Sequence, residues 1–410
     1  MEPKRHRDQF SFLKINTKLQ KNTEHLWEEI RSLGIHPSRR SYHSACVWRD
    51  RMLIYGGQNI QDGLQSGLWA FDLDNKNIEI WEEFEIPGLV PLCRHSAIVK
   101  GDFMYIFGGT NGEKAFNDTW VIDILNRRVE KITSNPPDFP PPHDSHTATL
   151  YENGISSSMI VFGGFVEETR TNKVYTLDLS NFKWKLEDTN NGPEPRSNHA
   201  AVLYHNDLYI YGGSSNEGEK LSDFWRLKLD TFIWEIVVPK QRIPAGRSGH
   251  SAIVYKDVMV IFGGMKDETQ ETNEMYSYGF LTNDWTLFQN DHQVKDPVSA
   301  AQLEEYKQAH KCHLMSRRHT VNSNLNKKES FSPLTPKPRA NTEMDVRTIN
   351  ISLEGRVQGR APHQRDGHSA VVHEDVMYIF GGDRHQMPFS DLYAYFLIEE
   401  ELKTPVKIDN

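Results

Sequence analysis

One short unit recurs along the whole chain: a pair of adjacent glycines that ends a run of apolar residues. Measured between second glycines, successive pairs are 52, 55, 49, 51 and then 118 residues apart. A histidine stands 14 residues before the second glycine in five copies and 18 before it in the third. A period near 50 residues is typical of repeat architectures in which each copy is one small sheet. We interpret the glycines as structural: Gly56, Gly57, Gly108, Gly109, Gly163, Gly164, Gly212, Gly213, Gly263, Gly264, Gly381 and Gly382.

Each copy is predicted to form four β-strands. In the fifth copy the first strand begins at His250, and a second apolar strand ends at the glycines. An alternating strand follows around Tyr276 and Tyr278, and a final strand is centred on Trp285. Alternation with a period of two places one set of side chains on a single face, which must be covered by a neighbour. The second copy has no final Trp, and residues 129–132 are expected to replace it.

These features resemble the kelch repeat, in which an Arg-x-x-His strand start, a Gly-Gly pair, a Tyr/Trp strand and a final Trp form one propeller blade. Six copies cover residues 27–397 apart from one long insertion. The resemblance implies an all-β, six-bladed propeller of four-stranded antiparallel blades, because radial stacking covers the apolar faces and leaves few open edges.

The last copy lacks its fourth strand, and the N-terminus supplies a candidate for it. Trp27 precedes Arg40 by 13 residues, as Trp234 precedes Arg247. We therefore predict that an N-terminal strand completes blade 6 and closes the ring. Deleting this segment is expected to expose a sheet edge and to destabilise the protein.

The repeats divide the chain into five segments. We predict a basic tail at 1–21, the propeller at 22–290, an insertion at 291–360, blade 6 at 361–398 and a C-terminal tail at 399–410. Residues 291–364 hold 12 Lys/Arg against 8 Asp/Glu. The insertion is expected to contain a short helix over 297–315 and then a polar, basic, disordered loop, because it has few apolar residues.

Composition limits the classes of function. The chain of 410 residues has a net charge of −9 and so lacks a nucleic-acid-binding signature. Its three cysteines form no paired framework, which favours a reducing compartment. The N-terminus has no apolar signal segment and no apolar run is long enough to span a membrane, so we expect a cytoplasmic protein that binds neither membrane nor nucleic acid.

We predict no catalytic residue, no cofactor and no metal. The six repeat histidines (His43, His95, His146, His199, His250 and His368) are spread one per blade, whereas zinc ligands converge on one ion. The insertion holds His310, Cys312, His313 and His319 without a standard ligand spacing, so a solvated helix is favoured over zinc. The alternative is a metal-dependent kelch enzyme, either an oxidase or a specifier-type lyase. Against the lyase, Glu219 and Asp223 begin the iron motif but Leu227 replaces its histidine.

The favoured function is a non-catalytic interaction module or scaffold. In kelch adaptors, residues before the first strand and after the glycines form a binding face. The matching candidates here are Arg40, Tyr42, Asn59, Arg94, Asn111, Phe165, Arg196, Asn198, Arg247, Lys266, Arg365 and Arg384, with Asp366 and Asp383 at equivalent positions. The rim arginines could hold an acidic peptide, or each could pair inside its own blade.

The partner itself is not identified by any motif. A cytoskeletal or ubiquitin-ligase component is a candidate, and no BTB domain is present to name a pathway. Thr320, Ser332 and Thr335 are candidate phosphorylation sites, whose phosphates could dock on the arginine rim.

Overall fold

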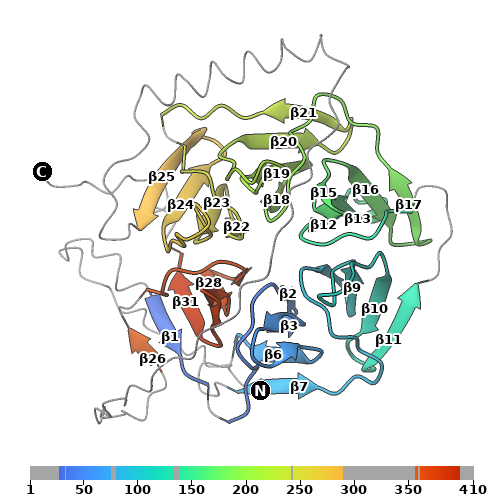
Figure 1. Cartoon of the computed structure of the whole chain (residues 1–410), viewed down its shortest axis with the longest axis vertical. Helices are drawn as coiled ribbons and strands as arrows, with labels where there is room; N and C mark the ends of the chain where they lie inside the picture. The colour runs from blue at the N-terminus through green and yellow to red at the C-terminus, as the bar shows by residue number, and fades with distance from the viewer. Residues whose placement is uncertain are drawn as a thin grey trace, which may run out of the picture.

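Six antiparallel sheets are arranged around a central axis in the computed structural model (Figure 1). The structure describes residues 27–32, 34–74, 80–132, 139–241, 243–289, 356–358 and 361–397. In this part of the chain no helix is long and apolar enough to cross a bilayer. The six-bladed propeller predicted from the repeats is confirmed.

The first three blades follow one another along the chain, and each sheet runs from the central axis outwards in the order of its strands. Blade 1 contains β2 (Ser44–Trp48), β3 (Arg51–Tyr55), β6 (Leu68–Asp72) and β7 (Trp81–Phe84). Blade 2 contains β8 (Ser96–Lys100), β9 (Phe103–Phe107), β10 (Thr119–Asp123) and β11 (Arg128–Ile132). Blade 3 contains β12 (Thr147–Glu152), β13 (Ser157–Phe162), β16 (Val174–Asp178) and β17 (Lys183–Leu186).

The other three blades repeat this order, with one difference in blade 6. Blade 4 contains β18 (Ala200–Tyr204), β19 (Asp207–Tyr211), β20 (Phe224–Lys228) and β21 (Ile233–Ile236). Blade 5 contains β22 (Ser251–Tyr255), β23 (Val258–Phe262), β24 (Met275–Gly279) and β25 (Asp284–Gln289). Blade 6 contains β27 (Ser369–His373), β28 (Val376–Phe380), β31 (Leu392–Phe396), β1 (Trp27–Ile30) and β26 (Arg356–Gln358).

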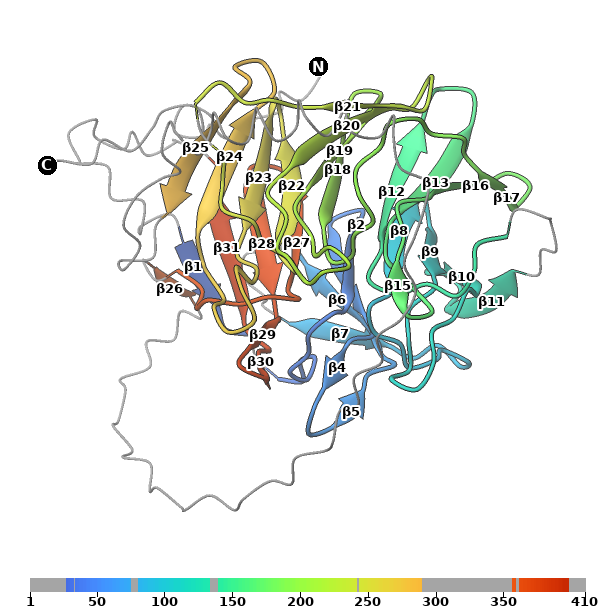
Figure 2. The same ribbon diagram turned by 45° about the horizontal axis from the view of Figure 1, so that its top comes forward.

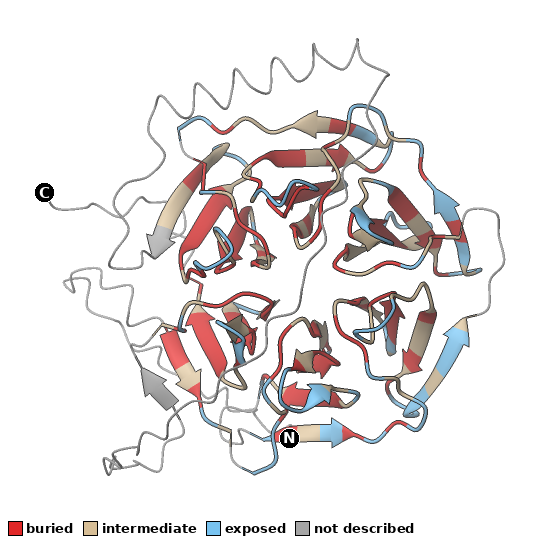
Figure 3. Cartoon of the chain, viewed as in Figure 1, coloured by how far each residue is buried: buried red, intermediate tan, exposed pale blue. Residues whose placement is uncertain are grey.

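The hydrophobic core is divided among the six junctions between blades. Each apolar cluster draws residues from two neighbouring blades, as Ile54 of blade 1 and Phe380 of blade 6 do. The final Trp of a blade packs on the aromatic residue before the glycines of the preceding blade; Trp234 and Phe162, for example, have ring centroids 5.0 Å apart. Figure 3 shows the burial of the inner strands and the exposure of loops and outer edges. Blade stacking therefore buries the faces that a single sheet would expose.

Trp27 occupies the position of the final Trp in blade 6, so the predicted ring closure is confirmed. Strand β1 pairs antiparallel with β31 through Trp27–Tyr395 to Ile30–Leu392. The Trp27 side chain is 0% exposed, and its ring centroid lies 5.5 Å from that of Phe262 in blade 5. Residues from the two ends of the described chain thus complete one sheet (Figure 1).

Blade 6 differs from the sequence prediction in one respect. A fifth short strand, β26, pairs with the outer side of β1 through Glu28–Gln358 to Ile30–Arg356. It comes from the segment predicted to be an insertion without further strands, and covers an edge that would otherwise remain open. The predicted helix at 297–315 lies outside the described residues.

A closed ring of six backbone hydrogen bonds surrounds the central axis. The residue before each repeat histidine donates its N–H to the equivalent residue of the preceding blade. The ring runs from Tyr42 to Gly367, Gly249, Asn198, Ser145, Arg94 and back to Tyr42, with N–O distances of 2.7–2.9 Å. All six residues have positive φ, between 53° and 66°. This conformation favours Gly and Asn, and the ring explains why it is adopted even by Tyr42 and Arg94.

The repeat histidines link neighbouring blades, as their predicted structural role requires. In five junctions the histidine Nε2 lies 2.7–2.9 Å from the Ser or Thr hydroxyl that follows the histidine of the preceding blade. Burial lowers the pKa of these histidines, to about 3 for His95, so they are neutral at pH 7. Their packing also explains the first glycine: a Cβ on Gly56 would lie 2.7 Å from His95 Cε1 and 2.4 Å from a backbone oxygen.

The junction between blades 4 and 5 lacks this hydrogen bond. Ala200 occupies the serine position, and the buried His250 Nε2 has no hydrogen-bond partner in the described structure. We expect Ala200→Ser to restore the bond and to raise the free energy of unfolding by about 1 kcal/mol. Urea denaturation measures this change. Ala201→Ser, whose side chain points to the other face of the strand, serves as the control. A loss of stability in Ala200→Ser would contradict the expectation.

Candidate interaction site

The segments before each first strand and after each glycine pair meet on one face of the ring, as predicted. In all six blades they form a single antiparallel bridge, such as Ser41–Gln58 in blade 1 and Asp366–Asp383 in blade 6. Short hairpins extend this face: β4–β5 (Gln58–Asn59, Gly63–Leu64), β14–β15 (Phe165–Val166, Thr169–Arg170) and β29–β30 (Asp383–Arg384, Met387–Pro388). Figure 2 shows β4–β5 and β29–β30 projecting together. We call this surface the hairpin face.

The four repeat arginines do not present free charges on the hairpin face. Arg40, Arg196, Arg247 and Arg365 are 0–2% exposed. In every case Nη1 donates to the carbonyl oxygen of the first glycine in its own blade, at 2.8–3.2 Å. Three of them also pair with an acid of that blade, and the distances are 2.6 Å to Asp223, 2.7 Å to Glu274 and 2.6 Å to Asp391.

This corrects the hypothesis that these four arginines hold an acidic peptide. A guanidinium whose donors are satisfied inside its blade would have to lose these bonds before it could contact a partner. The alternative, pairing within each blade, is what the structure shows. The sequence pattern alone does not separate the two, because a repeated arginine suits either role.

The other predicted rim residues have separate surroundings. Asn59 binds Asp62 within its hairpin, Asn111 accepts from the backbone of Lys114, and Lys266 pairs with Glu274 at 2.5 Å. Phe165 lies beneath the Arg170 guanidinium, Asn198 takes part in the backbone ring, and Arg384 lines a separate pocket. Only Tyr42 and Arg94 of the twelve reach the pocket described next.

A pocket of about 550 Å³ opens on the hairpin face between blades 5, 6 and 1, and Arg94 of blade 2 also lines it. We call it the mouth pocket. Its acidic and basic side chains are four carboxylates, one arginine and one histidine: Glu268, Glu271, Asp366, Asp383, Arg94 and His385. Apolar surface comes from Tyr42, Ile60 and Met265. The pocket is therefore acidic, the reverse of the basic rim that the arginines suggested.

Specific contacts hold these groups in place. The Tyr42 hydroxyl donates to Asp366 Oδ2 at 2.6 Å, and the Arg94 guanidinium lies 4.0 Å from the centre of the Tyr42 ring. Glu271 is fixed by His385, whose Nδ1 lies 3.2 Å from Oε2 and whose backbone N–H donates to Oε1 at 3.0 Å. Because Asp366 and Glu271 are only 4% and 6% exposed, most of their surface is already removed from water.

Burial and the neighbouring charges disfavour the ionisation of Asp366 and Asp383. Burial raises the pKa of Asp366 to about 6, and the charges of Asp383 and Glu271 add to this effect. Burial also raises the pKa of Asp383, again with a contribution from Glu271. Lys220 of blade 4 interacts electrostatically with Asp366, although its amine donates to Ser214 Oγ at 3.0 Å. Groups kept charged at a cost to stability are more common at functional sites than elsewhere.

We expect Asp366→Asn to stabilise the fold at neutral pH. Ionisation of Asp366 destabilises the native state as pH rises from about 4 to about 6, because its folded pKa of about 6 exceeds the unfolded value of 3.8. Asn retains an acceptor for Tyr42 but carries no charge. Its free energy of unfolding should exceed that of the wild type by about 1–2 kcal/mol at pH 7.5. Below pH 4 this advantage should disappear.

Urea denaturation at several pH values tests this prediction. Asp230→Asn, in an exposed turn of blade 4, is the matched control, and its effect should stay within about 0.5 kcal/mol at each pH. Equal stability of Asp366→Asn and the wild type across this range would contradict a destabilising ionisation of Asp366.

Two features bear on the enzyme alternative. Both carboxylate oxygens of Asp223, the aspartate of the incomplete iron motif, accept from Arg196 at 2.6 Å. Burial raises the pKa of the Cys46 thiol to about 12 and that of Cys93 to about 11, which disfavours the reactive thiolate. His310, Cys312, His313, His319, Thr320, Ser332 and Thr335 lie outside the described residues.

The comparisons with known proteins identify the family. Residues 3–156 and 127–309 match the KLHDC2/KLHL20/DRC7 Kelch-repeats domain, so this chain belongs to the Kelch-repeat family. Human Kelch domain-containing protein 3 is 30% identical over 252 residues, which cover 57% of this chain and 63% of that protein. Human Host cell factor 2 is 28% identical over 307 residues, covering 65% of this chain and 37% of that protein. These relatives are consistent with a protein-interaction module.

A third relative has the same repeats in a longer chain. The Drosophila melanogaster Leucine-zipper-like transcriptional regulator 1 homolog is 26% identical over 298 residues, which cover 66% of this chain and 29% of that protein. In all three relatives the match spans less than two thirds of the relative's own length.

Proposed function

We propose that this protein is a non-catalytic interaction module whose mouth pocket binds a basic segment of a partner protein. The observation that carries the proposal is the gathering of Glu268, Glu271, Asp366 and Asp383 in one pocket of the hairpin face. A lysine or arginine side chain entering the pocket would neutralise part of this charge. Charge-assisted hydrogen bonds to carboxylates are the strong class of polar contact, and Arg can make two in parallel.

Burial favours this arrangement over a general attraction of cations to an acidic surface. Asp366 and Glu271 lie in a low-dielectric environment, where a paired cation gains more than it would on an exposed surface. Tyr42 and Met265 supply apolar contact for the methylene groups of the same side chain. The pocket thus offers a charged end and an apolar wall to one long basic residue.

Selection from a displayed library of short random peptides tests the function, with the full chain as bait. We expect the selected peptides to share a Lys or Arg, and their binding to weaken as salt increases. Selection of acidic or uncharged apolar peptides would contradict the proposal. Peptides selected equally by a Glu268→Lys bait would place the binding site outside the mouth pocket.

The metal content of the purified protein distinguishes the interaction module from the enzyme alternative. A specifier-type lyase or a kelch oxidase would contain stoichiometric iron or copper, and elemental analysis of the purified protein detects either metal. The pairing of Asp223 with Arg196 favours the interaction module.

The proposal also covers where the protein acts and which kind of protein it binds. A cytoplasmic scaffold or adaptor role, with a cytoskeletal or ubiquitin-ligase partner, is supported only by the family and by the composition. Arg40, Arg196, Arg247 and Arg365 are buried and bonded within their blades, so they do not offer free charges on which loop phosphates could dock. Affinity purification with and without residues 291–360 would identify partners and test the insertion in one experiment.

A further inference from the structure

The blades are also joined on the face opposite the hairpin face, at the turns between first and second strands. In three junctions the last residue of a first strand is an aromatic hydrogen-bond donor to the turn aspartate of the next blade. Trp48 Nε1 donates to Asp102 at 2.9 Å, Tyr204 to Asp257 at 2.8 Å and Tyr255 to Asp375 at 2.5 Å. In each of these contacts, which we call latches, an aromatic side chain donates to a single carboxylate, and Asp102 also accepts from Arg49.

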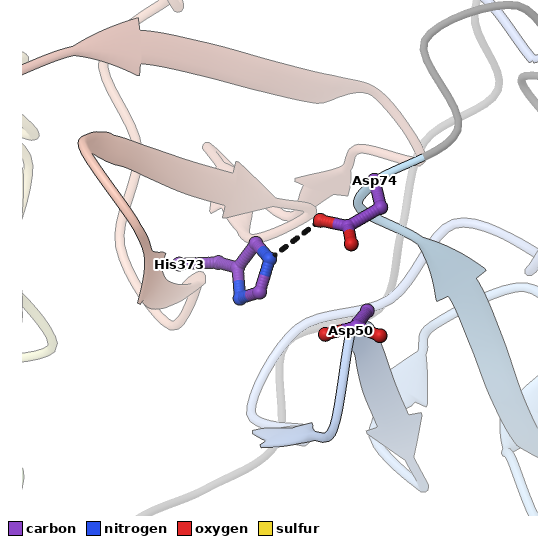
Figure 4. Close-up of side chains that lie close together, drawn as sticks. All are labelled: Asp50, Asp74 and His373. Atoms are coloured by element: carbon purple, nitrogen blue, oxygen red, sulfur yellow. Dashed lines mark hydrogen bonds and ion pairs between the residues drawn. The ribbon is translucent and has the colours of Figure 1, made fainter. Parts of the chain in front are cut away.

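The junction that closes the ring has different chemistry. The equivalent last residue in blade 6 is His373, and the turn aspartate of blade 1 is Asp50. His373 Nε2 lies 2.9 Å from Oδ1 of a second carboxylate, Asp74, which follows β6. One ligand atom from each of Asp50, Asp74 and His373 lies within 4.8 Å of the others. Figure 4 shows the imidazole and both carboxylates directed into the same space between blades 6 and 1.

The backbone holds these residues together. Leu73 N–H donates to the Asp50 carbonyl at 2.8 Å, which fixes the segment leading to Asp74 against the turn that carries Asp50. The neighbouring arginines are engaged elsewhere: Arg49 bonds to Asp102 at 2.8 Å, and Arg51 and Arg127 both bond to Glu82 at 2.6 Å. The two carboxylates therefore face each other beside a histidine whose ring can supply a lone pair.

We propose that Asp50, Asp74 and His373 bind Zn²⁺ and so join blade 6 to blade 1. One imidazole and two carboxylates are a ligand set suited to this ion, and water would complete a tetrahedral site. Because the carboxylates are exposed, small side-chain rotations can bring one oxygen of each to within about 2.1 Å of an ion that is also bound by His373, which is the metal-to-ligand distance of a zinc site. The site replaces a single hydrogen bond with a cross-link at the junction where the chain closes its ring.

Zinc binding to the full chain tests the proposal. After chelator treatment and dialysis, ZnCl₂ should raise the melting temperature by several degrees, because a ligand that binds only the native state stabilises it. His373→Tyr copies the residue found at positions 204 and 255, so it keeps a latch donor but loses the imidazole. In this variant and in Asp74→Asn the zinc-dependent shift should disappear. His205→Tyr, in an exposed turn outside the cluster, should retain it.

Titration calorimetry separates this site from other zinc-binding residues in the chain. The wild type should bind one more Zn²⁺ than His373→Tyr. Equal zinc stoichiometry and an equal thermal shift in the two proteins would overturn the proposal. A shift produced by Mg²⁺ or Ca²⁺ that persists in His373→Tyr would also overturn it, because such a site would depend on the carboxylates alone.

Discussion

Replacing Trp27 by Ala should lower the free energy of unfolding by about 3–5 kcal/mol. The side chain is fully buried between blades 5 and 6, and its ring centroid lies 4.7 Å from that of Tyr395 and 5.5 Å from that of Phe262. Truncation would leave a cavity at the junction that joins the two ends of the described chain. Equilibrium urea unfolding followed by tryptophan fluorescence and circular dichroism measures the loss.

A matched truncation shows whether the effect comes from closure. Ile155→Ala removes an apolar side chain that is 97% exposed, and should change stability by less than about 0.5 kcal/mol. Deletion of residues 22–31 should destabilise the fold further than Trp27→Ala, because it also opens the edge of β31. A deletion variant that melts with the full chain would refute closure by β1.

Reversal of one charge in the mouth pocket should weaken binding of a selected basic peptide by about a hundredfold. Glu268 is an exposed member of the pocket, so Glu268→Lys leaves the core unchanged. The new ammonium replaces attraction by repulsion, and juxtaposed like charges cost several kcal/mol at an interface. Isothermal titration at low salt measures the change in dissociation constant.

The control for this reversal makes the same change in net charge. Glu113→Lys alters an exposed loop of blade 2 on the hairpin face but outside the mouth pocket. We expect less than a threefold change in affinity for this variant, because solvent and salt screen the distant charge. Equal weakening by both substitutions would indicate a general electrostatic effect and would contradict a defined pocket.

The fold could be predicted because its determinants are local and repeated. Each glycine pair is required by positive φ angles and by two close histidines, the next blade's at the first glycine and its own blade's at the second. The position of Trp27 relative to Arg40 was enough to predict closure, because the same interval separates Trp234 and Arg247. The strand β26 gave no comparable signal: it contains three residues and belongs to no repeat.

The candidate site was harder to predict for a physical reason. Glu268 and Glu271 of blade 5 meet Asp366 and Asp383 of blade 6 only when the blades stack, although about 100 residues separate the two pairs in the sequence. The repeated arginines were predicted to bind a partner because they occur at the same position in several blades. They recur there because each bonds to a glycine carbonyl in its own blade. Residues that differ from those at the equivalent positions of other blades, such as Glu271 and His373, are better indicators of a site than residues that recur in every blade.

A crystal structure of the full chain with a selected peptide tests the central proposal most directly. We predict a Lys or Arg of the peptide in the mouth pocket, with its charged group within hydrogen-bonding distance of Asp366 or Asp383 and its methylene groups against Tyr42. A peptide bound to the outer strands, or to the face that carries His373, would contradict the proposed function. The same complex prepared with Glu268→Lys should show an empty mouth pocket.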